Sequence, residues 1–241
     1  LVGHHARYVQ ARNMTLALAG DFDPEAAEAE IREHFSVIPA GEVWVPPISA
    51  SRDSGVIESS LQKRQAALAI GFPGVGGDHA DRHPLAFLQE WASDMAGPLF
   101  MRIREQNGLA YQVGATQFHG FETGLFGFYL ATDPEQLDFA ERELREEIEK
   151  LAHDGVPQDA FERVRATILS RTALQAQPPG AISRHAAVDM LMGLPADHFR
   201  ELPGIMQHLT VDQVRHAAHD CLAKHEGVTA RIQPSSSVNK R

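Results

Sequence analysis

The feature that most constrains the fold is a pair of apolar segments joined by a short glycine-containing turn. Residues 109–118 and 124–132 are rich in aromatic, branched and small apolar side chains, and Gly120 lies between them. This arrangement predicts an antiparallel hairpin. Period-two alternation along the first strand places one set of side chains on a common face: Tyr111, Val113, Ala115 and Gln117.

The remaining segments place helices around this hairpin. Further strands are predicted at 64–72 and 228–233, and helices at 82–94, at about 99–107 and from Asp133 to about 154. Another helix is expected from Pro157 to before the break at Pro178-Pro179-Gly180, and more near 181–192, 196–208 and 211–224. The pattern predicts an α+β fold: a two-layer sandwich with a mixed, mostly antiparallel sheet and helices packed on one face.

The domain organisation follows from breaks in this pattern. Residues 14–20 are predicted to form a buried strand, and Asp23-Pro24 then opens a helix. The segment 39–53 is rich in proline and serine, which is typical of a linker. We therefore expect a strand–helix unit at 1–38, a linker at 39–53, a main domain at 54–233 and a disordered polar tail at 234–241. A weak likeness between the strands at 14–20 and 228–233 favours a family of duplicated halves.

Composition excludes several classes of protein. The net charge of −10 lacks the basic surplus of a nucleic-acid-binding protein. The single cysteine, Cys221, cannot form an internal disulfide or a cysteine zinc cluster. No segment approaches the ~20 apolar residues of a membrane span. These features do not decide the compartment, and a soluble protein of the bacterial periplasm or cytoplasm is expected. Sequence typical of a mid-domain at Leu1 predicts that the chain continues upstream.

The most informative site is the junction between the helix near 99–107 and the strand that follows. The turn at Asn107-Gly108 is expected to bring Arg104, at the helix end, close to Tyr111, at the strand start. A guanidinium and a phenol held together can bind peptide carbonyls or stabilise developing negative charge. The alternative is a structural role, in which Arg104 compensates the helix carboxyl terminus and Tyr111 packs at a sheet edge.

This junction resembles a signature of the second, non-zinc half of pitrilysin/insulinase-family zinc metallopeptidases, which include processing peptidases. That signature has the form Leu-Phe-x-x-x-Arg-Glu-x-x-Gly-Leu-Ala-Tyr. The matching residues here are Leu99, Phe100, Arg104, Glu105, Gly108, Leu109, Ala110 and Tyr111. The resemblance extends over most of the chain, through segments at 13–24, 124–128, 133–135, 193–194 and 209–214.

The resemblance implies a division of labour between two halves. In the family, an inverted His-x-x-Glu-His motif in the first half binds zinc and activates water. The second half closes over the first, and its arginine and tyrosine reach the peptide substrate. Carried over, the substrate-binding residues are Arg104 and Tyr111, and the implied partners are a peptide and a zinc-bearing half or separate catalytic subunit, as a homo- or heterodimer.

The chain departs from the complete family pattern because it contains no His-x-x-Glu-His. The closest match is His79-Ala-Asp-Arg82-His83, where Arg82 stands in place of the essential glutamate. Arginine cannot act as the base, and its charge repels a metal ion. We therefore expect no catalytic residue, metal site or cofactor in this chain, with zinc supplied by the missing half or by a partner. Whether the chain counts as an enzyme depends on that half.

Other candidate sites are weaker. His216, His219 and His225 offer a metal-like spacing without a matching acidic residue, so ordinary surface histidines are favoured. The acidic helix surface at 141–149 is expected to be solvated, with docking of a basic peptide as the alternative.

Two hypotheses about function remain. The first is the substrate-binding half of a zinc-dependent metalloendopeptidase that degrades or processes peptides. The second is a non-catalytic structural or partner subunit with the same fold, as in a processing peptidase or in the core of a respiratory complex. In the second case Arg104 and Tyr111 have only a structural role.

Overall fold

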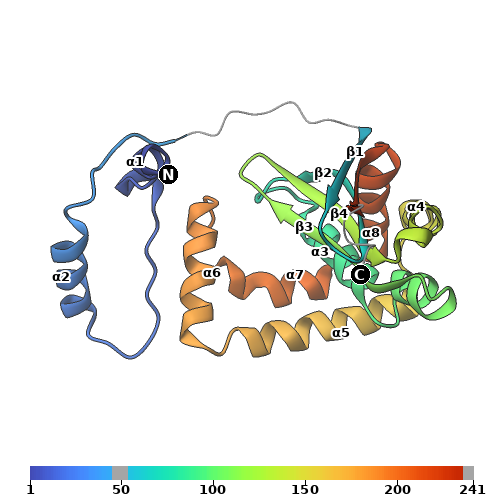
Figure 1. Ribbon diagram of the computed structural model, residues 1–241. Coiled ribbons are helices and arrows are strands. Elements are labelled where there is room, and N and C mark those ends of the chain that lie inside the picture. The colour runs from blue at the N-terminus through green and yellow to red at the C-terminus, as the bar shows by residue number, and fades with distance from the viewer. Residues whose placement is uncertain (45–53, 236–241) are drawn as a thin grey trace. The chain divides into compact units, whose positions relative to one another are not determined.

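The computed structural model describes residues 1–44 and 54–235, which belong to two compact units (Figure 1). The smaller unit comprises Leu1–Ser49 and Arg171–Pro203, and the larger comprises Ala50–Ser170 and Gly204–Arg241. The grouping of residues 171–203 with the amino-terminal segment was not expected from the sequence. The boundaries at 38 and 53 stay a prediction.

The larger unit is built on a five-stranded sheet with the order β1-β5-β2-β4-β3. The strands are β1 (Ser54–Leu61), β2 (Ala66–Val75), β3 (Ala110–His119), β4 (Thr123–Thr132) and β5 (Gly227–Pro234). β1 and β5 pair in parallel, and the other neighbours pair antiparallel. The predicted mixed, mostly antiparallel sheet is therefore confirmed, as is the hairpin formed by β3 and β4.

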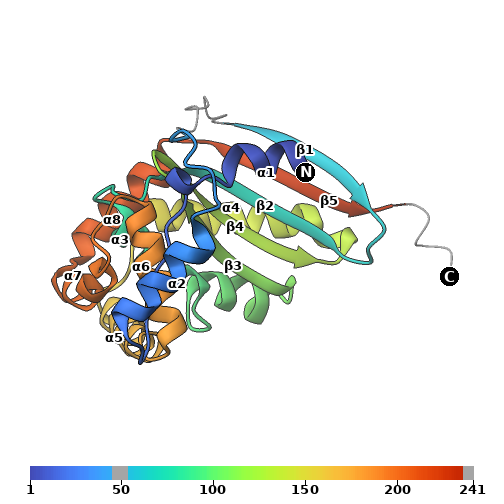
Figure 2. The same ribbon diagram turned by 90° about the vertical axis from the view of Figure 1, so that its left-hand side faces the viewer.

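Helices cover one face of this sheet, where the main core lies (Figure 2). Leu68, Ile70 and Phe72 on β2 alternate with more accessible residues and are at most 4% exposed. They pack with the buried faces of α3 (Arg82–Ser93) and α4 (Leu137–Asp154), as do Phe126 and Phe128 of β4. The predicted α+β sandwich with its helices on one face is confirmed.

The layer is completed by further helices. They are the π-helices η2 (Phe100–Gln106) and η5 (His219–Ala223), the 3₁₀ turn η3 (Pro134–Gln136) and α8 (Val211–Ala218). α5 (Gln158–Gln175) and α7 (Leu202–His208) each extend across a boundary between the two units. Over the ranges 1–44 and 54–235, none of the helices is long and apolar enough to cross a bilayer.

The edge strand β1 was not predicted, and it changes where the tail begins. Its sequence, SGVIESSL, is largely polar, and it is exposed throughout. It pairs with β5 from Ser54↔Gly227 to Leu61↔Pro234, and the Ser235 amide donates to the Leu61 carbonyl. Pro234 therefore belongs to the sheet rather than to the predicted tail, and residues 236–241 lie outside the described residues.

The regular alternation of side chains between the two faces, predicted for β3, is wrong at the start of the strand. Ala110 pairs with Thr132 and Gln112 with Ala131, so Tyr111 is an extra residue in a β-bulge. Tyr111 is 73% exposed, whereas Ala115 is 5% exposed. Tyr111 therefore does not share the face of Val113, Ala115 and Gln117.

The smaller unit consists of helices and extended segments with few buried side chains. Its elements are α1 (Val2–Tyr8), η1 (Ala11–Asn13), α2 (Pro24–Phe35), α6 (Pro179–Leu191) and η4 (His198–Glu201). Asp23 caps α2 by accepting from the Glu25 and Ala26 amides, as expected. The Trp44 amide donates to the Asn13 side chain at 2.8 Å, and residues 45–53 of the predicted linker lie outside the described residues.

The strand predicted at residues 14–20 is absent from this unit. The segment is extended, with Met14, Leu16 and Leu18 exposed on alternate positions. A strand requires a neighbour for its backbone hydrogen bonds. Within the described part of the chain no other segment pairs with it.

Candidate functional site

The helix that carries Arg104 is fixed by apolar anchors on its inner side. Leu99 and Ile103 of the π-helix region are fully buried, so the helix is held against the core. Gly97 permits the tight approach before it, since a Cβ there would lie 2.2 Å from the Trp91 carbonyl oxygen. The anchors leave Arg104 on the outer side, with 40% of its side chain exposed.

The turn after this helix depends on Gly108, which has φ +61°. L-residues with a side chain rarely adopt this conformation, so glycine is the favoured residue here. The Gly108 and Leu109 amides donate to the Arg104 and Ile103 carbonyls at 3.1 and 2.8 Å, which ends the helix. The Thr132 hydroxyl donates to the Leu109 carbonyl at 2.6 Å and ties the turn to β4.

The structure brings Arg104 and Tyr111 together, as the sequence predicted. The guanidinium carbon of Arg104 lies 5.3 Å from the centre of the Tyr111 ring and 4.7 Å from that of Phe100. Arg104 also donates through Nη1 to the Tyr111 carbonyl at 3.3 Å. A guanidinium held near two ring faces loses little further freedom on binding a ligand. Their role in binding peptide stays a prediction.

The pair borders an open pocket of about 270 Å³ at one end of the sheet. Its lining combines the turn, the start of β3 and the end of β4, and consists of Gln65, Arg104, Gly108, Leu109, Ala110, Tyr111, Ala131, Thr132 and Asp133. The guanidinium donors, the phenol and the Asp133 carboxylate make this a polar site with an apolar floor. Such a surface suits a peptide backbone, which offers carbonyl acceptors and amide donors.

A charged cluster behind the site was missed by the sequence analysis. Arg102 donates through Nε to Glu143 at 2.7 Å and through Nη1 to Glu147 at 2.8 Å, and it also pairs with Glu146. Asn107 donates to Glu143 at 2.8 Å. The guanidinium lowers the pKa of Glu143 from its usual value of about 4.5. The cluster joins the Arg104-bearing helix to α4.

The expectation of a solvated acidic surface at 141–149 is therefore wrong for its inner residues. The side chains of Glu141, Glu143 and Glu147 are 12%, 13% and 7% exposed. Glu141 accepts from Arg231 at 2.7 Å, so these carboxylates are neutralised within the fold. The signal for their burial was the spacing of Glu143 and Glu147, one helical turn apart, but their partner Arg102 is distant in the sequence.

The histidine candidates do not form a metal site in the part of the chain that the structure describes. At His79–His83, Arg82 Nη2 lies 3.0 Å from His83 Nε2, and Arg82 Nη1 donates to the Gly77 carbonyl at 2.5 Å. Across residues 1–44 and 54–235, no three His, Cys, Asp or Glu side chains are placed to hold a metal ion. The residues that the structure describes therefore offer no ligand set that fits a zinc ion.

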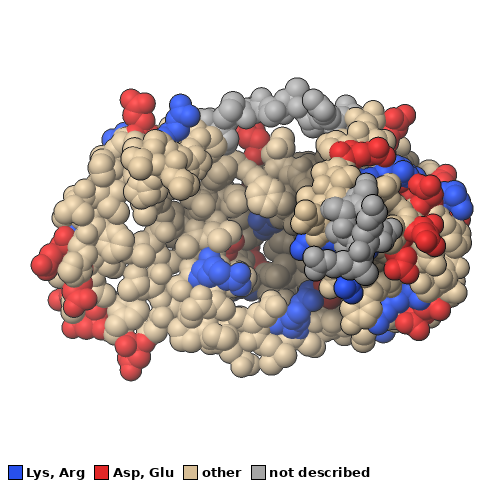
Figure 3. Space-filling model, in the orientation of Figure 1, with Lys and Arg blue, Asp and Glu red and all other residues tan. Residues whose placement is uncertain are grey.

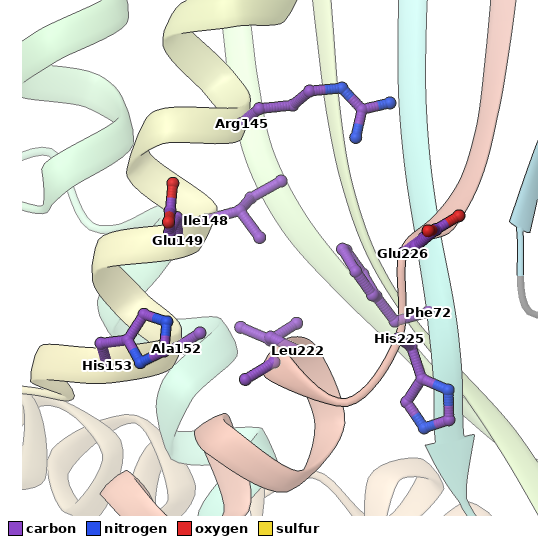
Figure 4. Close-up of a pocket in the computed structure, with 10 residues that line it drawn as sticks. Phe72, Arg145, Ile148, Glu149, Ala152, His153, Leu222, His225 and Glu226 are labelled. Atoms are coloured by element: carbon purple, nitrogen blue, oxygen red, sulfur yellow. The ribbon is translucent and has the colours of Figure 1, made fainter.

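A second pocket, of about 230 Å³, lies between α4 and the end of η5 (Figure 4). Its floor is apolar, with Phe72, Ile148 and Leu222 turned toward one another. The guanidinium of the adjacent Arg145 already forms hydrogen bonds within the fold, because it donates to Glu141 at 2.9 Å and to the Thr229 hydroxyl at 2.6 Å. The pocket therefore combines an apolar floor with polar side chains in its lining: Glu149, His153, His225 and Glu226.

Comparison with known proteins gives consistent results. The sequence family described as the peptidase M16 inactive domain matches residues 1–168. An uncharacterized zinc protease of Rickettsia bellii is 31% identical over 169 residues, covering 68% of this chain and 40% of that protein. The chain spans about half the length, or less, of the curated relatives that it matches.

Solved structures share the fold. The crystal structure of a peptidase M16 inactive domain from Pseudomonas fluorescens has a TM-score of 0.80 at 18% identity, covering 90% of this chain and 52% of that one. A chain of complex III2 from Candida albicans has a TM-score of 0.73 at 13% identity and covers 88% of this chain and 53% of that one. At these identities the likeness concerns the fold alone.

Proposed function

Because this chain belongs to the peptidase M16 family, in the part described as its inactive domain, we propose that it is the C-terminal, substrate-holding half of a zinc-dependent metalloendopeptidase. The observation that carries the proposal is the placement of Arg104 against Tyr111 on the rim of an open pocket. A structural role alone would not require the tyrosine to be 73% exposed.

In this proposal the two side chains bind the backbone of the substrate. The guanidinium of Arg104 donates to a peptide carbonyl, and the Tyr111 hydroxyl donates to a second one. Both groups become more effective where water is displaced and where charge develops on a carbonyl oxygen. Asp133, which also borders the pocket, can accept from a substrate amide.

In this proposal the hydrolytic metal belongs to another part of the enzyme, since the chain contains no His-x-x-Glu-His motif. Zinc would supply a water-derived nucleophile there. Zinc proteases among the relatives, and a match of about half of their length, support a zinc-bearing half upstream or on a separate subunit. The bacterial relatives support a bacterial source, and the likeness in fold to a periplasmic protease of Escherichia coli supports the periplasm as one candidate compartment.

Mutation of Arg104 tests the proposal in the complete peptidase, with the zinc-bearing half present. We expect Arg104→Ala to lower kcat/KM for peptide cleavage by about 10²-fold, by analogy with loss of an oxyanion-site donor. Tyr111→Phe should lower it by about 10-fold, since it removes one hydrogen bond. Arg142→Ala is the matched control, because Arg142 is an exposed arginine that also packs on an aromatic ring, Phe139. Unchanged turnover for Arg104→Ala would contradict the proposal.

A non-catalytic structural subunit is the second candidate, supported by the fold likeness to a chain of a respiratory complex. In that case Arg104→Ala should leave every peptide activity unchanged but lower thermal stability. A zinc-bearing partner with an intact His-x-x-Glu-His motif that cleaves peptides only with this chain would favour the peptidase.

A further inference from the structure

The helices of the larger unit cover one face of its sheet and leave the opposite face without a helix of that unit. Its residues follow from the strand register, since neighbours across the sheet point to the same side. Leu68, Ile70 and Phe72 point toward α3 and α4, so the residues between them point away. We call this opposite side the open face. Its central positions are Ala67, Ala69 and Gly71 on β2, Leu125, Gly127, Tyr129 and Ala131 on β4, Gln112, Gly114, Thr116 and Phe118 on β3, Val228, Ala230 and Ile232 on β5, and Ile57 on β1.

None of these open-face positions holds Asp, Glu, Lys, Arg or His. Charged residues make up 22% of the chain, so a surface of this extent without one is unusual. The charged strand residue Arg231 instead points to the helix side, where it pairs with Glu141. Large apolar side chains are accessible on the open face, including Phe118, Leu125 and Ile57.

Several positions of the open face are glycines, so no side chain projects from the sheet there. A Cβ at Gly114 would lie 2.9 Å from the Tyr129 hydroxyl, so the absence of a side chain leaves room for the tyrosine across the neighbouring strand. A Cβ at Gly71 would similarly lie 3.1 Å from Leu125 Cδ1. A low surface of this kind allows the backbone of another segment to approach closely.

The open face is continuous with the Arg104–Tyr111 pocket. Ala131 belongs to both, and Gln112 directly follows Tyr111 on β3. From there the ten-residue strands β2 and β4 extend for roughly 33 Å, at about 3.3 Å per residue. An extended peptide that is held at the pocket therefore has a path of about ten residues along the same sheet.

We propose that the open face binds an uncharged, apolar-rich stretch of the extended peptide whose backbone is held by Arg104 and Tyr111. This inference rests on the proposed function and names its substrate class. Apolar side chains gain contact with Phe118, Leu125 and Tyr129. A lysine or glutamate side chain placed on this face would lose water without meeting an opposite charge, which disfavours charged substrates.

The test uses the complete peptidase and peptides of equal length. One set has an uncharged stretch of Ala, Val, Leu and Ser, and the others carry Lys or Glu at every third position. Cleavage is followed by mass spectrometry, and binding by fluorescence anisotropy in an enzyme whose catalytic glutamate, in the zinc half, is replaced. We expect the uncharged set to bind about 10-fold more tightly than either charged set.

Ala69→Lys adds a single charge at an exposed position of the open face. We expect it to weaken binding of the uncharged peptides about 10-fold and to shift preference toward the Glu-bearing set. Ala166→Lys is the matched control, because Ala166 is an exposed alanine of α5. Thr116→Lys, on β3, repeats the test if Ala69→Lys fails to fold.

The outcomes separate the two proposals. If Arg104→Ala lowers turnover but Ala69→Lys and Thr116→Lys leave peptide preference unchanged, the open-face inference is wrong and the proposed function stands. If Arg104→Ala has no effect, the proposed function itself fails. Loss of association with the zinc-bearing half in Ala69→Lys, seen by gel filtration, would identify the face as a subunit contact and would also overturn the inference.

Discussion

The two faces of the sheet differ in how they handle charge. On the helix side, Arg102 and Arg231 meet Glu141, Glu143 and Glu147 in short ion pairs. In the space-filling view, acidic and basic side chains gather on the side of the molecule where α4 lies (Figure 3). The open face has no charged side chain at the positions given above.

This difference in charge between the two faces separates a stabilising role from a binding role. Half-buried charges on the helix side have partners, so they fix the position of η2 against α4 at a limited desolvation cost. On the open face an unpaired charge would repel any bound molecule that carries a charge of the same sign. The ion pairs on the helix side therefore hold η2, which carries Arg104, against α4. Binding on the open face, as proposed above, would depend on apolar contact.

The sharpest test of this contrast is the same substitution at adjacent residues on opposite faces. Leu68 is 1% exposed on the helix side, so Leu68→Lys buries an unpaired ammonium group and should cost at least about 4 kcal/mol. Ala69 is exposed, and Ala69→Lys should change the free energy of unfolding by about 0.5 kcal/mol or less. Urea unfolding measures both, and equal losses would show that the open face is covered.

Removal of the cation from the helix-side cluster should have the next largest effect. Arg102→Met leaves Glu143 and Glu147 without their guanidinium and should lower the free energy of unfolding by about 3 kcal/mol. Arg142→Met serves as the control, since Arg142 is exposed, and should cost about 0.5 kcal/mol or less. A loss below 1 kcal/mol for Arg102→Met would mean that the cluster does not hold the helix.

Acid should weaken the same cluster. The hydrogen bond from Arg102 lowers the pKa of Glu143 in the folded chain below its unfolded value of about 4.5. The contribution to stability is therefore complete above pH 4.5 and is lost as the pH falls through the lower folded value. Glu143→Gln, which loses a charged hydrogen bond worth about 2 kcal/mol, should have a flatter stability profile between pH 5 and the acid limit of folding. Parallel profiles for the two proteins would contradict this cause.

The smallest effect is expected where the pocket meets the core. Thr132 is 2% exposed, and its hydroxyl donates to the Leu109 carbonyl. Thr132→Val keeps the shape but removes this donor, so we expect a loss of about 1 kcal/mol. Faster amide exchange at Gly108 and Leu109, with the α4 amides unchanged, would place the effect in the turn. Faster exchange throughout the sheet would instead indicate a general loss of packing.

The sequence predicted what depends on local pattern and missed what depends on distant partners. The hairpin, the cap at Asp23 and the approach of Arg104 to Tyr111 follow from short spacings and from the turn at Gly108. The edge strand β1 was missed because its sequence is polar and its partner β5 lies at the other end of the domain.

The errors have related physical causes. Residues 14–20 have the composition of a strand, but composition does not supply the neighbouring strand that a sheet requires. Arg102 and Glu143 lie 41 positions apart, so nothing in either local sequence indicates their ion pair. The bulge at Tyr111 escapes detection because a single extra residue leaves the apolar pattern on both sides intact.

That bulge has a consequence for how such a site can arise and vanish. Because Ala110 and Gln112 already pair with consecutive residues of β4, one inserted codon supplies the aromatic ring without turning over any downstream side chain. Loss of the same codon would remove the Tyr111 ring and restore continuous pairing between β3 and β4. Deletion of that one residue would therefore remove the aromatic ring while Ala110 and Gln112 keep their partners Thr132 and Ala131 on β4.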